Sequence, residues 1–295
     1  MSIAVDTYCL QCHLRRNLEL ARTLGTEQQA MAFAKEVMKL YISAPEGVAS
    51  PWFSAHVADI LHEMYGLPID RFHQEKCDSN RFVLERLPQI REKVESAEDP
   101  VFAGLQFAIL GNYLDFSALQ GKVSFEKLEE MLAQALTMEL DMETYASLRR
   151  DLETGKKLLY LTDNAGEIGF DRVFAEEIAK RYPHLEITFC VRGGIAQNDA
   201  TREDAAEMGI PFPIIDNGNR IAGTQIDMLG EEAKQALETA DVILAKGMAN
   251  CETMHGCGLN VYYAFLVKCQ RFVDLFGGPM FTAMLVKEKG KIAAQ

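Results

Sequence analysis

The stretch "LLYLTDNAGE" (residues 158–167) is apolar in its first half and abruptly polar in its second, where an acid, an amide, a glycine and another acid follow. The apolar half predicts a buried strand, and the apolar face that runs from Phe170 to Ile178 predicts a packed helix after it. Gly166 allows the backbone to turn tightly between the two. In an open parallel sheet, ligands bind beyond the carboxyl ends of the strands, so this turn is a predicted binding site.

Strand-like and helix-like segments alternate throughout the second half of the chain. Helical patterns such as 169–182 and 231–240 separate short apolar runs that predict strands at residues 157–162, 186–191, 212–216, 241–246 and 279–286. This alternation predicts right-handed crossovers and a mostly parallel sheet that is covered by helices on both faces.

The first half of the chain has a different pattern. Its apolar residues recur three and four apart, and Pro and Gly interrupt them, which predicts helices over 16–24, 28–44, 53–67, 82–96, 101–116 and 124–136. We therefore expect an α/β protein with two domains. The first is an all-helical domain (residues 1–150), and the second is a Rossmann-like α/β/α metal-binding domain (residues 151–295).

Composition excludes several classes of partner. The chain has 295 residues, 48% of them hydrophobic, and a net charge of −13, so it can bury a core but lacks the basic surface that nucleic acid or an anionic membrane requires. It has neither the basic and apolar start of a signal peptide nor an apolar run of about 20 residues. These features predict a cytoplasmic protein. An acidic enzyme that acts on an anionic substrate needs a local cation.

Polar side chains also follow the second and fourth predicted strands. Asp199 follows the second strand, as Asp163 and Asn164 follow the first. An N-cap role would explain one of the polar residues after the first strand, but not Asp, Asn and Glu together. Carboxylate and amide oxygens are hard ligands that suit Mg²⁺ or Mn²⁺, so Asp163, Asn164 and Asp199 are the predicted metal ligands.

Basic residues lie at the same strand ends. Arg192 follows the second strand and Lys246 the fourth, and both are suited to holding an oxyanion such as phosphate. Asn250 and Glu252 come shortly after Lys246 and are candidates for orienting a substrate or a water molecule.

Other motifs point to no alternative cofactor. The first strand is not followed by GxGxxG, and the chain contains no GxSxG. Cys9, Cys12 and His13 match the haem-attachment pattern CxxCH, but that attachment usually needs an exported chain. A zinc site would need further ligands that nothing in the sequence brings close. We expect Cys9 and Cys12 to be half-buried thiols at a helix start, without a catalytic role.

Several segments together resemble the DUF89 family, the metal-dependent damage-control phosphatases. They are "CLQC" (9–12), "DRFHQEKCDSN" (70–80), "TDNAGE" (162–167), "RGG" (192–194) with "ND" (198–199), and "KGMANCET" (246–253), with weaker agreement in "GNYLDF" (111–116) and "GTQID" (223–227). The N-terminal CxxC is similar to that of a prokaryotic subgroup. The sequence departs from the usual pattern at Ala222, Met248 and Ala249, which concerns contacts to the substrate.

The resemblance implies a helical domain, a Rossmann-like domain and hydrolysis of small phosphometabolites. It implies that Asp163, Asn164 and Asp199 hold a divalent metal (Mg, Mn, Co or Ni). Residues Asp70, Lys76, Ser79 and Asn80 match the helical-domain motif and are expected to shape the cleft.

Phosphoryl transfer depends mainly on neutralising the phosphate oxygens and on an in-line nucleophile. The predicted catalytic residues are Asp163, Lys246 and Glu252, and the predicted substrate contacts are Glu167, Arg192, Lys246 and Asn250. The attacking group is either a metal-activated water, which we favour, or Asp163 itself.

Two alternative functions stay open at this point. A carboxyl methyltransferase would need an acid at the end of the second strand to bind adenosine, where this chain has Arg192. A protein that binds a metal or metabolite without catalysis would show no hydrolysis in an assay.

Overall fold

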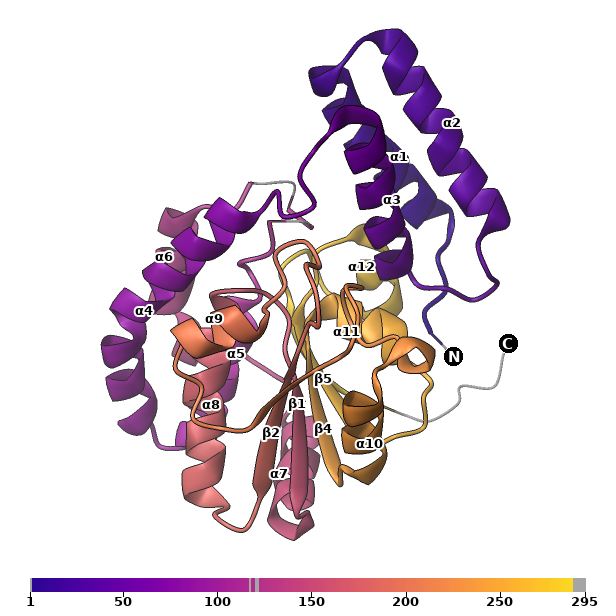
Figure 1. The fold of residues 1–295 in the computed structure, drawn as a ribbon. Coiled ribbons are helices and arrows are strands. Elements are labelled where there is room, and N and C mark those ends of the chain that lie inside the picture. Colours follow the sequence, from indigo (N-terminus) through magenta and orange to yellow (C-terminus); the bar gives the residue numbers. More distant parts are fainter. Residues whose placement is uncertain (1, 117, 120–121, 289–295) are drawn as a thin grey trace.

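The computed structural model describes residues 2–116, 118–119 and 122–288. Figure 1 shows a layered α/β body with a smaller unit of three helices at one end. The helices are α1 (Thr7–Leu24), α2 (Glu27–Ser43), α3 (Ser50–Tyr65), α4 (His73–Glu95), α5 (Pro100–Gly111), α6 (Phe125–Ala133), α7 (Met142–Thr154), α8 (Glu167–Arg181), α9 (Arg202–Glu207), α10 (Glu231–Thr239), α11 (Gly247–Met254) and α12 (Gln270–Phe276), with 3₁₀ turns η1 (Ala135–Thr137) and η2 (Ile226–Met228).

The sheet has six strands in the order β3-β2-β1-β4-β5-β6. The strands are β1 (Lys157–Leu161), β2 (Glu186–Val191), β3 (Ile214–Asp216), β4 (Val242–Lys246), β5 (Val261–Leu266) and β6 (Ala283–Lys287). All neighbouring strands are parallel except the β5–β6 pair. The mostly parallel sheet of the predicted fold class is therefore confirmed.

Some elements differ from the prediction. Strand β5 and helices α7, α9, α11 and α12 are not predicted from the sequence, and the last strand begins at Ala283 rather than at residue 279. Periodicity alone does not separate a short, fully apolar run such as "VYYAFL" from a buried helix, and all six residues of β5 are buried. Helix α1 also begins nine residues earlier than predicted, because the side chain of Asp6 caps it by accepting a hydrogen bond from Cys9 N at 3.1 Å.

Both faces of the sheet are buried, as successive residues of β1 illustrate. Leu158 and Tyr160 belong to one hydrophobic cluster, and Leu159 and Leu161 belong to another. Side chains alternate between the faces of a strand, so each cluster covers one face. Helices cover both faces, and the fully apolar pattern of β1 follows from this arrangement.

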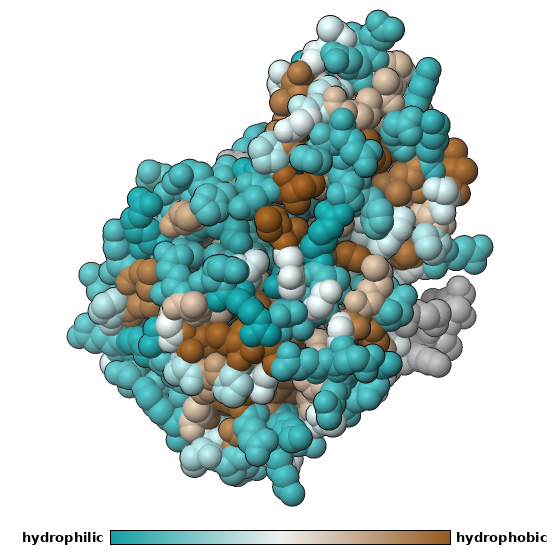
Figure 2. Space-filling view, in the orientation of Figure 1, coloured by the Kyte–Doolittle hydropathy of each residue, from teal (hydrophilic) through white to brown (hydrophobic). Residues whose placement is uncertain are grey.

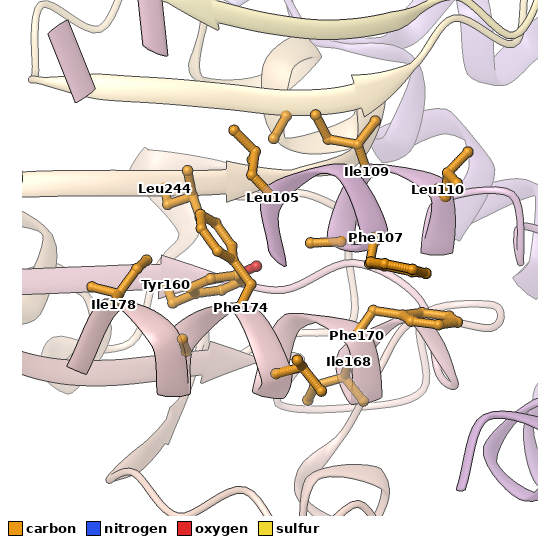
Figure 3. Packing of buried hydrophobic residues seen from close by; sticks show 14 of the residues in the cluster. Leu105, Phe107, Ile109, Leu110, Tyr160, Ile168, Phe170, Phe174, Ile178 and Leu244 are labelled. Atoms are coloured by element: carbon orange, nitrogen blue, oxygen red, sulfur yellow. The ribbon is translucent and has the colours of Figure 1, made fainter. Parts of the chain in front are cut away.

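The larger cluster is built around the contact between α5 and α8. Figure 3 shows Phe107 of α5 above Phe170 of α8, with Tyr160 and Leu244 from the sheet beside them. A Cβ on Gly104 would lie 3.0 Å from the Cα of Phe174, so glycine allows the two helices to approach closely.

Helices α1–α3 have a hydrophobic cluster of their own, which includes Phe33, Val37 and Leu61. Helices α4–α7, in contrast, contribute to the same cluster as one face of the sheet, through residues such as Val83, Leu128 and Leu148. That cluster crosses residue 150, so the division into domains 1–150 and 151–295 stays a prediction. No helix in the described part of the chain is long and apolar enough to cross a membrane.

Candidate active site

The three predicted metal ligands come together at the carboxyl edge of the sheet. The main chain at Asn164 forms an isolated antiparallel bridge with Asp199. Next to it, Ala200 N donates a hydrogen bond to Asp163 O at 2.7 Å. The turn after β1 and the loop after β2 are thus paired through their backbones, which fixes the three side chains relative to one another.

Only some of the oxygens in this group are used by the protein. Asp163 Oδ2 accepts hydrogen bonds from the side-chain amides of Asn112 (2.9 Å) and Asn164 (2.8 Å), and Asp199 Oδ2 accepts one from Arg192 Nε (2.7 Å). No hydrogen bond from a described residue is made to the Oδ1 atoms of Asp163 and Asp199. These two carboxylate oxygens therefore remain for a ligand, with Arg192 Nη2 at 3.9 Å from Asp163 Oδ1.

The electrostatics of this group favour a bound cation. Burial raises the pKa of Asp163 well above its usual range, and the charges of Asp199 and Glu167 raise it further. Burial also raises the pKa of Asp199 to about 6, although Arg192 opposes that shift. Carboxylates that repel one another in a buried place are stabilised by a positive ion between them.

The donor set fits a hard divalent ion. No three His, Cys, Asp or Glu side chains gather as a metal-binding group within residues 2–116, 118–119 and 122–288. The predicted set is of another kind, because it has two carboxylates and one amide. Oxygen donors of this kind suit Mg²⁺ or Mn²⁺, which keep water molecules as their remaining ligands.

Gly247 is required by the position of Asp163. It follows β4 directly and has a φ of +79°, and a Cβ at this place would overlap the carboxylate of Asp163. Any other residue would both strain the backbone and push Asp163 out of its position.

Lys246 lies beneath the site rather than in it. Its ammonium donates to Glu167 Oε1 (2.7 Å), Asp171 Oδ1 (2.8 Å) and Ala108 O (2.7 Å), and the side chain is fully buried. These three bonds use all three of its protons. This geometry therefore does not favour the predicted contact between Lys246 and phosphate. Glu167, the partner of Lys246, is also fully buried and hydrogen-bonded within the protein.

Arg192 and Asn250 also hold the loops. Arg192 bonds Asp199, and its Nη2 donates to Thr162 O at 3.0 Å. Asn250 Nδ2 donates to the same Thr162 carbonyl at 3.1 Å and to Lys246 O at 2.6 Å. Both side chains are buried, and Arg192 Nη1 makes no hydrogen bond within the described residues. Arg192 and Asn250 therefore support the loops, and their contact with a substrate stays a prediction.

A cavity of about 450 Å³ lies over the carboxyl edge of the sheet. Of the predicted site residues, Asp163, Asn164, Asp199 and Glu252 line it. Helices α1 and α3 form its opposite wall, since they stand over this edge of the body (Figure 1). Figure 2 shows a largely hydrophilic surface on the viewed face, with apolar patches where the α1–α3 unit meets the body.

Two residues of the cavity wall are missing from the sequence-based site. Lys268 Nζ lies 2.7 Å from Asp115 Oδ2, and both side chains line the cavity. The positive charge of Lys268 opposes the rise in the pKa of Asp163 that burial causes. Lys268 follows β5 as Asp163 follows β1, and recognising β5 as a strand would have identified it.

The helical-domain motif (residues 70–80) contacts the segments that carry the site residues. Asn80 Oδ1 accepts a hydrogen bond from Gly166 N at 2.7 Å, and Lys76 Nζ lies 2.8 Å from Asp204 Oδ2. Neither Asn80 nor Lys76 is among the residues that line the cavity. The motif therefore secures the turn after β1 and helix α9.

The thiols lie at the opposite wall. Cys9 and Cys12 line the cavity from α1, where Cys9 Sγ accepts a hydrogen bond from Arg271 Nη1 at 3.0 Å. Burial raises the pKa of Cys9, which favours the unreactive thiol. That the two thiols are not catalytic stays a prediction.

Glu252 lines the cavity, and the pKa of its carboxyl group is raised. Burial raises its pKa from 4.5 to about 7, against the opposing charge of Arg271. The folded protein then holds a proton that the unfolded chain releases, so the contribution of Glu252 to stability is full below pH 4.5 and is lost as the pH rises to about 7.

We expect Glu252→Gln to remove this dependence. In urea unfolding at pH 5 and pH 7.5, the variant should gain stability relative to the natural protein as the pH rises. Other titrating groups are present in both proteins and cancel in the comparison. A difference in unfolding free energy that is the same at both pH values would contradict the assignment.

Known proteins are similar to this chain over most of its length. The family model for the damage-control phosphatase ARMT1-like domain matches residues 5–284. A damage-control phosphatase from Archaeoglobus fulgidus is 34% identical over 275 residues, which cover 90% of this chain and 93% of the relative. Another, from Pyrococcus horikoshii, is 30% identical over 191 residues, or 64% of this chain and 65% of that protein.

A solved structure supports the fold. The crystal structure of a DUF89 family protein from Pyrococcus horikoshii superposes with a TM-score of 0.79 at 24% identity, covering 98% of this chain and all (100%) of that chain. The resemblance to DUF89 is thereby confirmed, whereas membership of the CxxC subgroup stays a prediction. With a match over nearly its whole length and relatives that are named phosphatases, the chain belongs to the damage-control phosphatase ARMT1-like family and is a phosphatase.

Proposed function

We propose that this phosphatase hydrolyses small phosphometabolites with the help of a divalent cation held by Asp163, Asn164 and Asp199. The observation that carries the proposal is the pair of Oδ1 atoms on Asp163 and Asp199 that accept no hydrogen bond from the described residues, both on residues that line a cavity of about 450 Å³. When bound, the cation would withdraw charge from a phosphate oxygen and lower the pKa of a water molecule. A cavity of this size suits a small metabolite.

Lys268 is the residue that we propose to bind the phosphate. It lines the same cavity as Asp163, and within the described residues its ammonium donates to one partner, Asp115 Oδ2, at 2.7 Å. Its remaining protons are therefore available to phosphate oxygens. Lys246, in contrast, would act by neutralising Glu167 and Asp171 below the site.

Glu252 is a suitable proton donor for the leaving oxygen. A carboxyl group with a pKa of about 7 is partly protonated near neutral pH, and such a pKa suits general acid catalysis. We propose that water, and not Asp163, attacks the phosphorus. Hydrolysis of a chiral phosphate ester should then invert the configuration at phosphorus, whereas retention would indicate a phosphorylated Asp163.

The methyltransferase alternative is less compatible with the site. The acid that would bind adenosine at the end of β2 is replaced by Arg192, which is buried and bonded to Asp199 at 2.7 Å. The phosphatase relatives favour hydrolysis as well.

Metal dependence is tested on protein that has been treated with EDTA and then dialysed. We expect a panel of small phosphate monoesters to remain intact until Mg²⁺, Mn²⁺, Co²⁺ or Ni²⁺ is added, because the free carboxylates alone repel the phosphate. Full activity in the presence of EDTA would contradict the proposed cation.

A further inference from the structure

The wall of the cavity opposite the carboxylates is basic. Arg15 and Arg16 of α1 both line the cavity. The other side of the same helix is apolar, and Leu14 and Leu18 pack against the cluster formed by α1–α3. The packing of α1 therefore determines which of its residues face the substrate.

These arginines lack acidic partners, although the chain is rich in acids. It has 43 Asp and Glu against 30 Lys and Arg, yet no described carboxylate lies within ion-pair distance of Arg15 or Arg16. The other basic residues nearby are paired. Arg22, further along α1, lies 3.2 Å from Glu27, and Arg271 lies 3.0 Å from Asp6.

A third arginine lies next to this wall. Arg71, between α3 and α4, lines a small pocket that adjoins the cavity and shares Ser54 and Gln197 with it. Its Nη1 is buried and makes no hydrogen bond within the described residues. Burial lowers the pKa of Arg71, the charge of Arg16 lowers it further, and the charge of Glu75 opposes this shift.

Other groups near this wall do not neutralise it. His13 lies beside Arg16 and is hydrogen-bonded to Tyr41 at 2.7 Å and Ser50 at 3.0 Å. Burial lowers its pKa to about 4, so it is uncharged near pH 7. A buried donor without an acceptor and guanidinium groups without acids are both stabilised by a bound anion.

We propose that Arg16 and Arg71, with Arg15 at the rim, bind a second anionic group of the substrate. The inference rests on the proposed function, in which the scissile phosphate lies at Asp163 and Asp199 on the other side of the cavity. The enzyme then prefers phosphometabolites that carry a further carboxylate or phosphate. A neutral sugar monophosphate would leave these arginines without a partner.

The experiment compares three substrates that differ in their second group: a hexose monophosphate, a hexose bisphosphate and an aldonic acid phosphate. We expect kcat/KM of the natural protein to be about tenfold or more higher for at least one of the two doubly anionic compounds. Arg16→Gln and Arg71→Gln should each raise KM for that compound until its kcat/KM equals that for the monophosphate. The kcat/KM for the monophosphate itself should change by no more than about twofold. The compound whose excess is lost identifies the second anion as carboxylate or phosphate.

Arg22→Gln is the matched control, since it removes an arginine from the same helix outside the cavity. Equal kcat/KM for all three substrates in the natural protein would overturn the proposal, and so would an equal loss for all three in Arg16→Gln. If none of the three compounds is hydrolysed with any cation, the proposed function fails, and calorimetric binding of the same compounds then tests the second anion site separately. Tighter binding of a doubly anionic compound that is lost in Arg16→Gln would support that site. Equal affinities for all three compounds would overturn it.

Discussion

Replacing Asp163 with alanine is expected to lower kcat/KM by about 10³-fold or more and to remove measurable Mn²⁺ binding. Asp163 offers one of the two unused carboxylate oxygens at the site, and the amides of Asn112 and Asn164 hold its other oxygen in place. Replacing the Asp163 carboxylate removes both a negative charge and a metal ligand that is held in a fixed position. Steady-state kinetics and calorimetric titration with Mn²⁺ measure the two effects.

The thermal stability of the metal-free protein, unlike its activity, should not fall when Asp163 is replaced with alanine. The pKa of Asp163 is raised by burial and by the charges of Asp199 and Glu167, so its carboxylate is unfavourable in the folded protein without a cation. We expect the metal-free variant to unfold at the same temperature as the natural protein or higher. Asp274→Ala, at an exposed aspartate of α12, is the control and should change neither activity nor Mn²⁺ affinity. Unchanged Mn²⁺ affinity in Asp163→Ala would refute the assigned site.

Lys246→Ala is expected to destabilise the fold by about 3–5 kcal/mol, the cost of leaving one partner of a buried ion pair uncompensated. Its ammonium is fully buried between Glu167 and Asp171. Burial raises the pKa of Asp171 to about 7, although the positive charge of Lys246 opposes that shift. Without Lys246, the two acids would have to take up protons or repel one another. Urea unfolding of the metal-free protein measures the loss.

Two further variants separate this role from phosphate binding. Adding Asp171→Asn to Lys246→Ala should restore part of the stability, because it removes one of the two unpaired acids. Lys268→Ala should instead lower kcat by about 10²-fold, as for the loss of one donor to the charge of the transition state, with a smaller loss of stability. If Lys246→Ala is as stable as the natural protein and yet loses turnover to this extent, Lys246 is the phosphate ligand that the sequence predicts.

The contrast between these two lysines shows where sequence reasoning reaches its limit. Both lie at the carboxyl end of a strand, but the strand before Lys268 is not predicted from the sequence. Lys246 is the last residue of β4, and its side chain points to the face covered by α5 and α8, where it meets Ala108 O and Glu167. Lys268 lies two residues beyond β5 and reaches the cavity. Lys246 belongs to its strand, so the alternation of side chains places it on the face covered by helices, whereas Lys268 lies beyond its strand and is not subject to that alternation.

The sequence by itself determined the layered α/β architecture and the grouping of Asp163, Asn164 and Asp199. Apolar runs, helical periodicity and polar strand ends are local signals, and parallel strands bring their carboxyl ends to one edge. Only the tertiary structure decided that Lys246 is buried against Glu167 and Asp171, and that α1 lines the cavity with Arg15 and Arg16. The contacts of Lys246 join segments more than 70 residues apart in the sequence, and Ala108 is 138 residues away. Local sequence patterns carry no information about such contacts.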